Sequence, residues 1–300
     1  MNWPEALRAH TRPLPGSTPY EQLRPIRVRE RFDGWPLLRF LSTSCPFASH
    51  DEWLEIVARE RLLNNDQPAR VDAIVRSGQV YVHVLPDMVE PDVNVDIRVL
   101  HDDDAILVVS KPAPLPVHPS GRFNKNSLVS ILEGACPGLR LRVVHRLDSD
   151  TTGCIVFARS REAANELRRQ FEACIPEKRY LARVSPPPGQ DSFACEDRIS
   201  RDPGPGGSRC VDPSGLEART AFSTLSRFAD GSALVEAAPE TGRTHQIRVH
   251  LAQLGSPVVG DELYGPGGEG PLCLHAKSLR VRHPETGEEI TFSTDPPPWA

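Results

Sequence analysis

One polar segment concentrates residue types that could perform covalent chemistry. It contains His145-Arg146-Leu147-Asp148 and is followed by the apolar run Cys154 to Ala158. A carboxylate can act as a nucleophile when its position is fixed and a cation lies nearby, and Arg146 is two residues from Asp148. The same composition also suits a surface loop of salt bridges. This segment alone does not decide between the two interpretations.

A second segment, Glu240 to His250, combines a turn signal with a basic cluster. Gly242 permits a tight turn, and Thr244 is a candidate cap for a following helix. Arg243, His245 and Arg248 lie within six residues, beside the positive end of that helix. The pattern is typical of a site that binds phosphate or orients a carboxylate, but it also fits an ordinary basic helix start.

The third segment is Glu177-Lys178-Arg179-Tyr180, at the entry to an apolar run that ends at Val184. A tyrosine can stack on a nucleobase through its ring and form a hydrogen bond through its hydroxyl. An isolated tyrosine in a strand serves packing in most proteins. The role of Tyr180 therefore depends on what lies beside it.

The elements that position these segments are short strands and amphipathic helices. Apolar runs predict four buried strands, and apolar residues at three- and four-residue steps predict two helices. Strand and helix signals do not alternate strictly, so an α+β fold is expected, with a mixed and largely antiparallel sheet flanked by helices. The strands are expected at Ala105 to Val109, Cys154 to Ala158, Leu181 to Val184 and Ala233 to Ala237, and the helices from Ala163 to Cys174 and from Ile247 to Leu254.

The composition limits the class of protein. Apolar runs are too short to cross a bilayer and no signal-peptide pattern is present, which predicts a soluble, intracellular protein. The seven cysteines are scattered without a CxxC pair, so buried free thiols are expected rather than disulfides or a metal site. The net charge of −5 does not by itself indicate a nucleic-acid partner. Any RNA binding must come from local clustering of basic residues.

Composition shifts divide the chain into three parts. Residues 1–26 carry five prolines with little periodicity and predict an extended arm. Residues 27–95 predict a small helix-plus-strand module, and an acidic linker around Glu90-Pro91-Asp92 precedes a larger domain over residues 97–300. Within that domain the Gly- and Pro-rich stretch Asp202 to Gly215 is either a recognition loop or a long hairpin connection.

Taken together, the polar segments resemble the motifs of one family. Residues 142–158 are similar to the catalytic motif of the RluA-type pseudouridine synthases, which reads His-Arg-Leu-Asp followed by Thr/Ser-Gly and an apolar strand. The resemblance extends over about residues 97–292. The other matching motifs are Ser110 to Pro119, Lys178-Arg179-Tyr180, Gly242 to Arg248 and Leu274-His275-Ala276.

This resemblance implies a catalytic set. Asp148 would be the nucleophile, Arg243 the arginine that pairs with it, and Tyr180 the tyrosine that packs against the target base. Arg146 would fill the gap left by the flipped nucleotide. His145, Lys178, His245 and Arg248 would help to bind RNA. The reaction isomerises uridine and exchanges no electrons or phosphoryl groups with a second substrate, so neither cofactor nor metal is expected.

The module at residues 27–95 resembles, more faintly, the S4 RNA-binding domain found before this catalytic domain in many relatives. It contains 8 Lys and Arg against 12 Asp and Glu from Arg27 to Asp96, whereas binding through phosphates favours a basic surface. Either its RNA-binding role is weakened, or one face remains basic. That face would comprise Arg29, Arg31, Arg39, Arg59 and Arg61.

The expected function is a site-specific uridine isomerase that acts as a monomer on structured ribosomal or transfer RNA in the cytoplasm. Two alternatives remain open: an RNA-binding protein without catalysis, and a hydrolase that uses Asp148 with His145. The hydrolase has no second carboxylate or Ser/Cys elbow beside that pair and leaves Gly242 to Gln246 unexplained.

Overall fold

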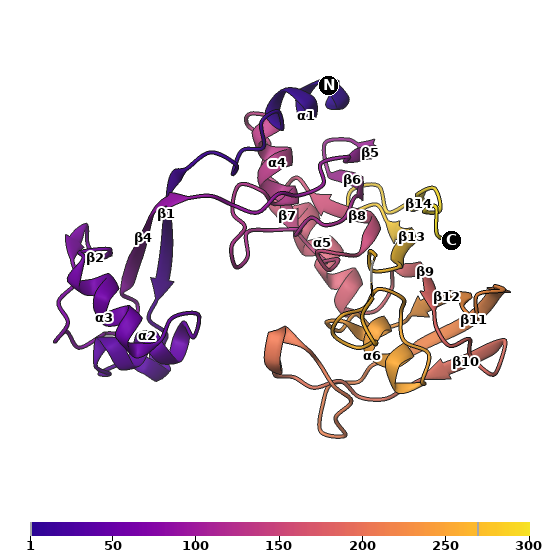
Figure 1. The fold of residues 1–300 in the computed structure, drawn as a ribbon. Coiled ribbons are helices and arrows are strands. Elements are labelled where there is room, and N and C mark those ends of the chain that lie inside the picture. Colours follow the sequence, from indigo (N-terminus) through magenta and orange to yellow (C-terminus); the bar gives the residue numbers. More distant parts are fainter. Residues whose placement is uncertain (1, 269) are drawn as a thin grey trace. The chain divides into compact units, whose positions relative to one another are not determined.

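The structure is a computed structural model that describes residues 2–268 and 270–300. The chain divides into two compact units. Figure 1 labels most of their helices and strands along the ribbon. The larger unit comprises the residues up to Pro15 together with residues 91–300, and the smaller unit comprises Gly16–Glu90.

The smaller unit packs two helices against an antiparallel sheet in the order β1-β4-β2-β3. Ser49 and Glu52 form a capping box at the start of α3, and Trp53 of that helix is completely buried in the core. Its elements are β1 (Tyr20–Arg27), the short 3-10 turn η1 (Glu30–Phe32), α2 (Leu37–Ser44), α3 (His50–Ala58), β2 (Leu62–Asn64), β3 (Gln67–Pro68) and β4 (Val80–Met88).

Residues 1–26 differ from the extended arm that their prolines predict. Trp3–His10 form helix α1, which starts at the Asn2 cap with Pro4 in its first turn, where a proline costs no hydrogen bond. Trp3 and Leu7, one helical turn apart, are buried in the core of the larger unit beside α4 (Leu128–Ala135). Tyr20–Arg27 pair with β4, so the second half of this segment belongs to the smaller unit.

A ten-stranded sheet forms the centre of the larger unit. Its main path runs β10-β11-β12-β9-β13-β8-β6-β5, with β14 paired to β13 and β7 to β8. All pairs are antiparallel except β8–β13. The strands are β5 (Arg98–Asp102), β6 (Ile106–Lys111), β7 (Arg142–Val143), β8 (Thr152–Ala158), β9 (Glu177–Val184), β10 (Ser192–Cys195), β11 (Thr220–Arg227), β12 (Ala233–Pro239), β13 (Leu274–Arg282) and β14 (Glu289–Ser293).

The expected α+β class and mixed sheet are confirmed. Helix α5 (Arg161–Glu172) packs on β8 through Ala163, Ala164 and Leu167, as the spacing of its apolar residues predicts. Helix α6 (Gln246–Gln253) lies against β11 and β12. A second 3-10 turn, η2 (Pro205–Gly207), lies in the loop after β10.

Gly153 allows the parallel contact between β8 and β13. It has a φ of +110°, and a Cβ atom there would lie 2.3 Å from the carbonyl oxygen of Ala276. A larger residue would therefore push the two strands apart. Because Gly153 follows the Asp148 segment by only a few residues, this close contact also fixes where that segment ends.

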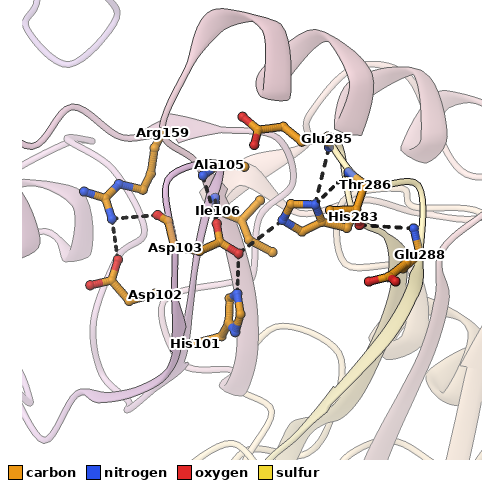
Figure 2. A network of polar contacts seen from close by, with 10 residues as sticks. All are labelled: His101, Asp102, Asp103, Ala105, Ile106, Arg159, His283, Glu285, Thr286 and Glu288. Atoms are coloured by element: carbon orange, nitrogen blue, oxygen red, sulfur yellow. Dashed lines mark hydrogen bonds and ion pairs between the residues drawn. The ribbon is translucent and has the colours of Figure 1, made fainter.

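At the other end of these strands, a polar network joins two turns (Figure 2). Asp103, between β5 and β6, accepts hydrogen bonds from Nε2 of His101 at 2.5 Å and of His283 at 3.1 Å. Its other oxygen accepts from the backbone N–H groups of Ala105 and Ile106, both at 2.8 Å. The network ties the β5–β6 turn to the β13–β14 turn.

Candidate active site

Asp148 lies in the loop between β7 and β8 and lines a cavity of about 730 Å³. The backbone N–H of Thr151 donates to the Asp148 carbonyl at 3.2 Å, which closes a turn around the aspartate. The side chain of Asp148 is 28% exposed, so it is accessible from the cavity but held by the protein. Each of the eight sequence-predicted site residues lines this cavity: His145, Arg146, Asp148, Lys178, Tyr180, Arg243, His245 and Arg248.

The buried side chain of Lys111 supports the loop between β7 and β8, which carries Asp148. Its Nζ donates to the carbonyl oxygens of Pro112, Leu115 and Ser149 at 2.9, 2.7 and 2.8 Å, which matches the three N–H groups of an ammonium. Burial lowers the pKa of Lys111 to about 7, although the charges of Asp150 and Asp148 oppose this shift. Since Ser149 follows Asp148 directly, Lys111 fixes the backbone that carries the aspartate.

Arg248 is the arginine that pairs with Asp148. It projects from α6, and its Nη1 donates to Oδ2 of Asp148 at 3.1 Å. Its Nε and Nη2 donate to the two carboxylate oxygens of Asp261 at 2.7 and 2.8 Å. Although burial lowers the pKa of Arg248, its hydrogen bonds to Asp261 and the charges of Asp261 and Asp148 raise it above the usual value. One permanent cation therefore joins two carboxylates.

The partner predicted for Asp148 was Arg243, and the structure corrects this. Nε of Arg243 donates to the carbonyl oxygen of Glu217 at 2.8 Å, and the side chain lies at the cavity wall. The reason is that Arg243 belongs to the turn before α6, whereas Arg248 lies inside the helix. The two arginines therefore do not share a helix face.

The turn before α6 also differs from its expected form. Thr244 does not cap the helix: the cap residue is His245, in the left-handed region with a φ of 58°. Gly242 has no positive φ, so the unusual backbone falls on a histidine instead. Oε1 of Gln246 holds the turn by accepting from the Arg243 backbone N–H at 2.9 Å and from the Thr241 hydroxyl at 2.7 Å.

His245 faces the second oxygen of the aspartate. Its Nε2 lies 3.7 Å from Oδ1 of Asp148, and its Nδ1 lies 2.8 Å from the hydroxyl of Tyr264. Burial lowers the pKa of His245, partly opposed by the charge of Asp148. Asp148 is thus flanked by an arginine on Oδ2 and a histidine near Oδ1.

Tyr180 and Lys178 reach the cavity from β9. Tyr180 is half-buried between two hydrophobic clusters, and burial, together with the charge of Asp148, raises its pKa above the usual value, which keeps the phenol neutral. Nζ of Lys178 donates to the carbonyl oxygens of Thr241 and Glu240 at 2.9 and 3.4 Å. Burial lowers the pKa of Lys178. Lys178 thereby connects β9 to the turn before α6.

His145 and Arg146 are adjacent in the chain but differ in environment. The ring of His145 stacks on Phe171 at 4.6 Å, and its Nε2 accepts a hydrogen bond from the Val156 backbone at 3.1 Å. Burial lowers the pKa of His145 to about 3, so its ring is neutral. Arg146 is exposed at the cavity mouth and forms no ion pair within residues 2–268 and 270–300.

Sequence reasoning missed three residues that organise the site: Lys111, Asp261 and Tyr264. Lys111 stands in the motif Ser110 to Pro119, in which the sequence pattern assigned the lysine no role. Asp261 follows Gly260, whose φ of +76° and close approach to the Pro271 carbonyl require a glycine. The Gly-Asp pair was a signal for a tight turn that carries a carboxylate.

Among residues 2–268 and 270–300, no group of three or more His, Cys, Asp or Glu side chains is arranged to hold a metal ion. Within the same described residues, no helix is both long and apolar enough to cross a membrane.

Comparison with known proteins gives a consistent result. The family model described as RNA pseudouridylate synthase matches residues 105–253. A relative from Synechocystis sp., named as an uncharacterized RNA pseudouridine synthase, is 32% identical over 296 residues, covering 92% of this chain and 90% of that relative. The ribosomal large subunit pseudouridine synthase D of Nitrosomonas europaea is 31% identical over 297 residues, covering 92% and 79%. The solved structure of human RNA pseudouridylate synthase domain containing 1 has a TM-score of 0.57 at 28% identity, covering 67% of this chain and 83% of that one.

Proposed function

The chain belongs to the RNA pseudouridylate synthase family, and from this premise we propose that Asp148 is the nucleophile with which it isomerises uridines in structured RNA. Family membership makes the protein an isomerase that acts on RNA. The observation that carries the role of Asp148 is its placement: a partly exposed carboxylate in the large cavity, fixed by Arg248 and by a loop that Lys111 supports.

The reaction sets the demands on the site. The bond between C1′ of the ribose and N1 of uracil breaks, the base rotates, and C1′ bonds to C5, which loses its proton while N1 gains one. Atoms balance within the nucleotide apart from this proton exchange. The protein must therefore hold an attacking group in one pose and exclude competing reactions. A carboxylate bound by a permanent cation suits this task.

The uridine must leave its stack to reach Asp148, which costs a few kcal/mol and is least costly in loops. Tyr180 is proposed to pack against the flipped base, since its neutral ring lines the cavity. Arg146 is proposed to fill the vacated space, because it is exposed at the mouth. Lys178, His245, His145 and Arg243 complete the wall that would face RNA.

The target is proposed to be ribosomal or transfer RNA. The Nitrosomonas relative is named for the large ribosomal subunit, which supports a ribosomal target first. Pseudouridines mapped in cells with and without the gene would identify the site. A pseudouridine in ribosomal RNA that disappears without the gene supports a ribosomal target. If pseudouridines disappear only from transfer RNA, transfer RNA is the target.

The nucleophile is tested with Asp148→Asn, which keeps the size of the side chain, and with Asp104→Asn as the control at an exposed position that does not line the cavity. RNA labelled with tritium at uracil C5 releases the label when C5 is bonded to C1′. We expect no release by Asp148→Asn and near-normal release by Asp104→Asn. Near-normal turnover by Asp148→Asn would show that Asp148 is not the nucleophile. Wild-type protein that retains RNA without converting uridine would favour a binding role instead.

The smaller unit is proposed to have an S4-like fold and to contact RNA through one basic face. Arg27, Arg29 and Arg31 line a cavity of about 390 Å³ on this unit, which supports local basic character in an acidic segment. Arg59 is less suited, because it pairs with Glu55. Alanine at the three arginines should weaken RNA binding, whereas Arg59→Ala should not. If the triple variant and Arg59→Ala bind RNA with equal affinity, the three arginines do not form an RNA-binding face.

A further inference from the structure

Tyr264 connects the aspartate site to the loop that the sequence left unassigned. Its hydroxyl accepts a hydrogen bond from the backbone N–H of Arg209 at 2.6 Å and lies 2.8 Å from Nδ1 of His245. Arg209 belongs to the Gly- and Pro-rich stretch from Asp202 to Gly215. Nε2 of the same histidine lies 3.7 Å from Oδ1 of Asp148. A continuous line of polar groups therefore runs from the loop to the proposed nucleophile.

Donor counting indicates where the proton of the neutral His245 ring lies. The tyrosine hydroxyl has one hydrogen to donate, and its oxygen already accepts from Arg209. Among the described residues, Nδ1 of His245 is the acceptor placed to receive that hydrogen. With Nδ1 as acceptor, the ring proton must be on Nε2. The opposite tautomer would leave the hydroxyl hydrogen without this partner.

Electrostatics leads to the same tautomer independently. Nε2 faces a carboxylate oxygen, so an N–H dipole there is attractive and a lone pair is repulsive. We infer that Tyr264 is a positioning residue that holds His245 as the Nε2–H tautomer directed at Asp148. This inference rests on the proposed role of Asp148 as the reacting group. With Arg248 on Oδ2, both carboxylate oxygens then face donors.

Burial of the ring favours a neutral histidine. Burial lowers the pKa of His245; Asp148 and Asp261 oppose this shift, and Arg248 and Arg209 reinforce it. A neutral imidazole has one N–H, so its tautomer decides whether Asp148 faces a donor or an acceptor. The ring of Tyr264 is itself fixed, because it packs against Arg248 at 5.1 Å and meets the His245 ring edge to face.

The backbone of His245 supports a positioning role. A non-glycine residue at a φ of 58° is disfavoured and persists where the surroundings impose it. This conformation directs the ring between Asp148 and Tyr264 rather than into solvent, and the side chain is only 14% exposed. The Arg209 backbone and the Tyr264 hydroxyl thus hold the ring on the side opposite Asp148.

The direct test is the tautomer itself. Long-range ¹H–¹⁵N spectra of the full-length, ¹⁵N-labelled protein distinguish Nε2–H from Nδ1–H, and the His245 signals are identified by their loss in His245→Gln. We expect Nε2–H in the wild type and a shift towards Nδ1–H in Tyr264→Phe, which keeps the ring and removes the hydroxyl. A wild-type ring protonated on Nδ1 overturns the inference whatever the activity of the protein.

Kinetics separate positioning from folding. Tyr264→Phe should lower kcat by about tenfold, the typical worth of one hydrogen bond, with KM changed by less than about twofold. Tyr81→Phe, in the core of the smaller unit, is the matched control and should leave kcat unchanged. Arg209→Ala keeps the backbone donor and should preserve the tautomer. Unchanged kcat and tautomer in Tyr264→Phe refute the inference. If Asp148→Asn remains active, the role of Asp148 fails while the spectra still decide the tautomer.

Discussion

Arg248 donates to Asp148 from one nitrogen at 3.1 Å and binds a second carboxylate with the other two. Asp261, that second carboxylate, is 1% exposed and also accepts from the backbone N–H groups of Leu263 and Tyr264 at 3.0 and 3.1 Å. The arginine is therefore anchored on its buried side and presents a fixed donor to the cavity. This geometry makes Arg248 the cation that orients the proposed nucleophile.

The first prediction compares two arginines that differ by five positions. Arg248→Lys keeps a positive charge, but a single ammonium cannot reproduce the planar fork that serves two carboxylates. We expect kcat to fall roughly 100-fold through misplacement of Asp148. Arg243→Lys loses only a hydrogen bond to the Glu217 carbonyl and should lose about tenfold or less. Single-turnover rates measure both. If kcat falls further in Arg243→Lys than in Arg248→Lys, Arg243 rather than Arg248 is the arginine that orients Asp148.

The second prediction concerns the buried side of the same pair. Asp261→Asn removes one charge from a buried ion pair and leaves the Arg248 guanidinium with Asp148 alone. We expect a loss of about 3 kcal/mol in the free energy of unfolding, because breaking one partner leaves a buried charge poorly compensated. Urea unfolding followed by tryptophan fluorescence measures this. The control is Glu262→Gln, which makes the same change from carboxylate to amide at the exposed neighbouring position. A loss of equal size in the control would contradict the explanation.

The sequence predicted local features of this site better than contacts across the chain. The Asp148 segment and the strand after it were recognisable, because a polar loop before an apolar run is a local pattern. The pairing of Asp148 with Arg248 joins residues 100 positions apart and depends on how α6 starts. That start is set by the left-handed backbone of His245 and by the side chain of Gln246, neither of which the composition of the segment reveals.

Lys111 illustrates a second limit of prediction from the sequence. A lysine between strand and proline is expected to be exposed from its type, yet Lys111 is 1% exposed because three carbonyl oxygens converge on its ammonium. That convergence depends on how the segment after β6, which carries Pro112 and Leu115, folds back and meets the β7–β8 loop at Ser149. Helix α1 fails for a different reason, because its signal is local. Trp3 and Leu7 have helical spacing, but the surrounding prolines favour an extended chain.

The third prediction is a dependence of stability on acid at the network in Figure 2. Burial would raise the pKa of Asp103, but hydrogen bonds from His101, from the backbone of Ile106 and Ala105 and from His283 lower it to about 2. The folded-state pKa is thus below the unfolded value of about 3.9, so the carboxylate stabilises the fold above about pH 4. This contribution is lost as the pH falls towards 2.

Asp103→Asn removes this titration. We expect it to cost about 1 kcal/mol at neutral pH, a value reduced for screening because the side chain is one-third exposed. The difference from the wild type should shrink between about pH 4 and about pH 2. Urea midpoints across this range measure it, with the exposed Asp104→Asn as control. A difference that stays constant with pH would mean that Asp103 does not titrate as described.

The fourth prediction separates two uses of Arg146, the exposed arginine at the cavity mouth. If it fills the space left by the flipped uridine, Arg146→Ala should reduce single-turnover conversion by roughly tenfold or more for a uridine inside a helix, where unstacking costs a few kcal/mol. For a uridine already unstacked in a loop, the reduction in single-turnover conversion should be smaller. If Arg146 instead binds a phosphate, Arg146→Ala should reduce the conversion of both RNAs equally. The slope of log affinity against log salt should then fall by about 0.7 to 0.9. Arg161→Ala, exposed on α5, is the control for charge alone. We expect the context-dependent loss with an unchanged salt slope, because Arg146 is exposed and lines the same cavity as Asp148.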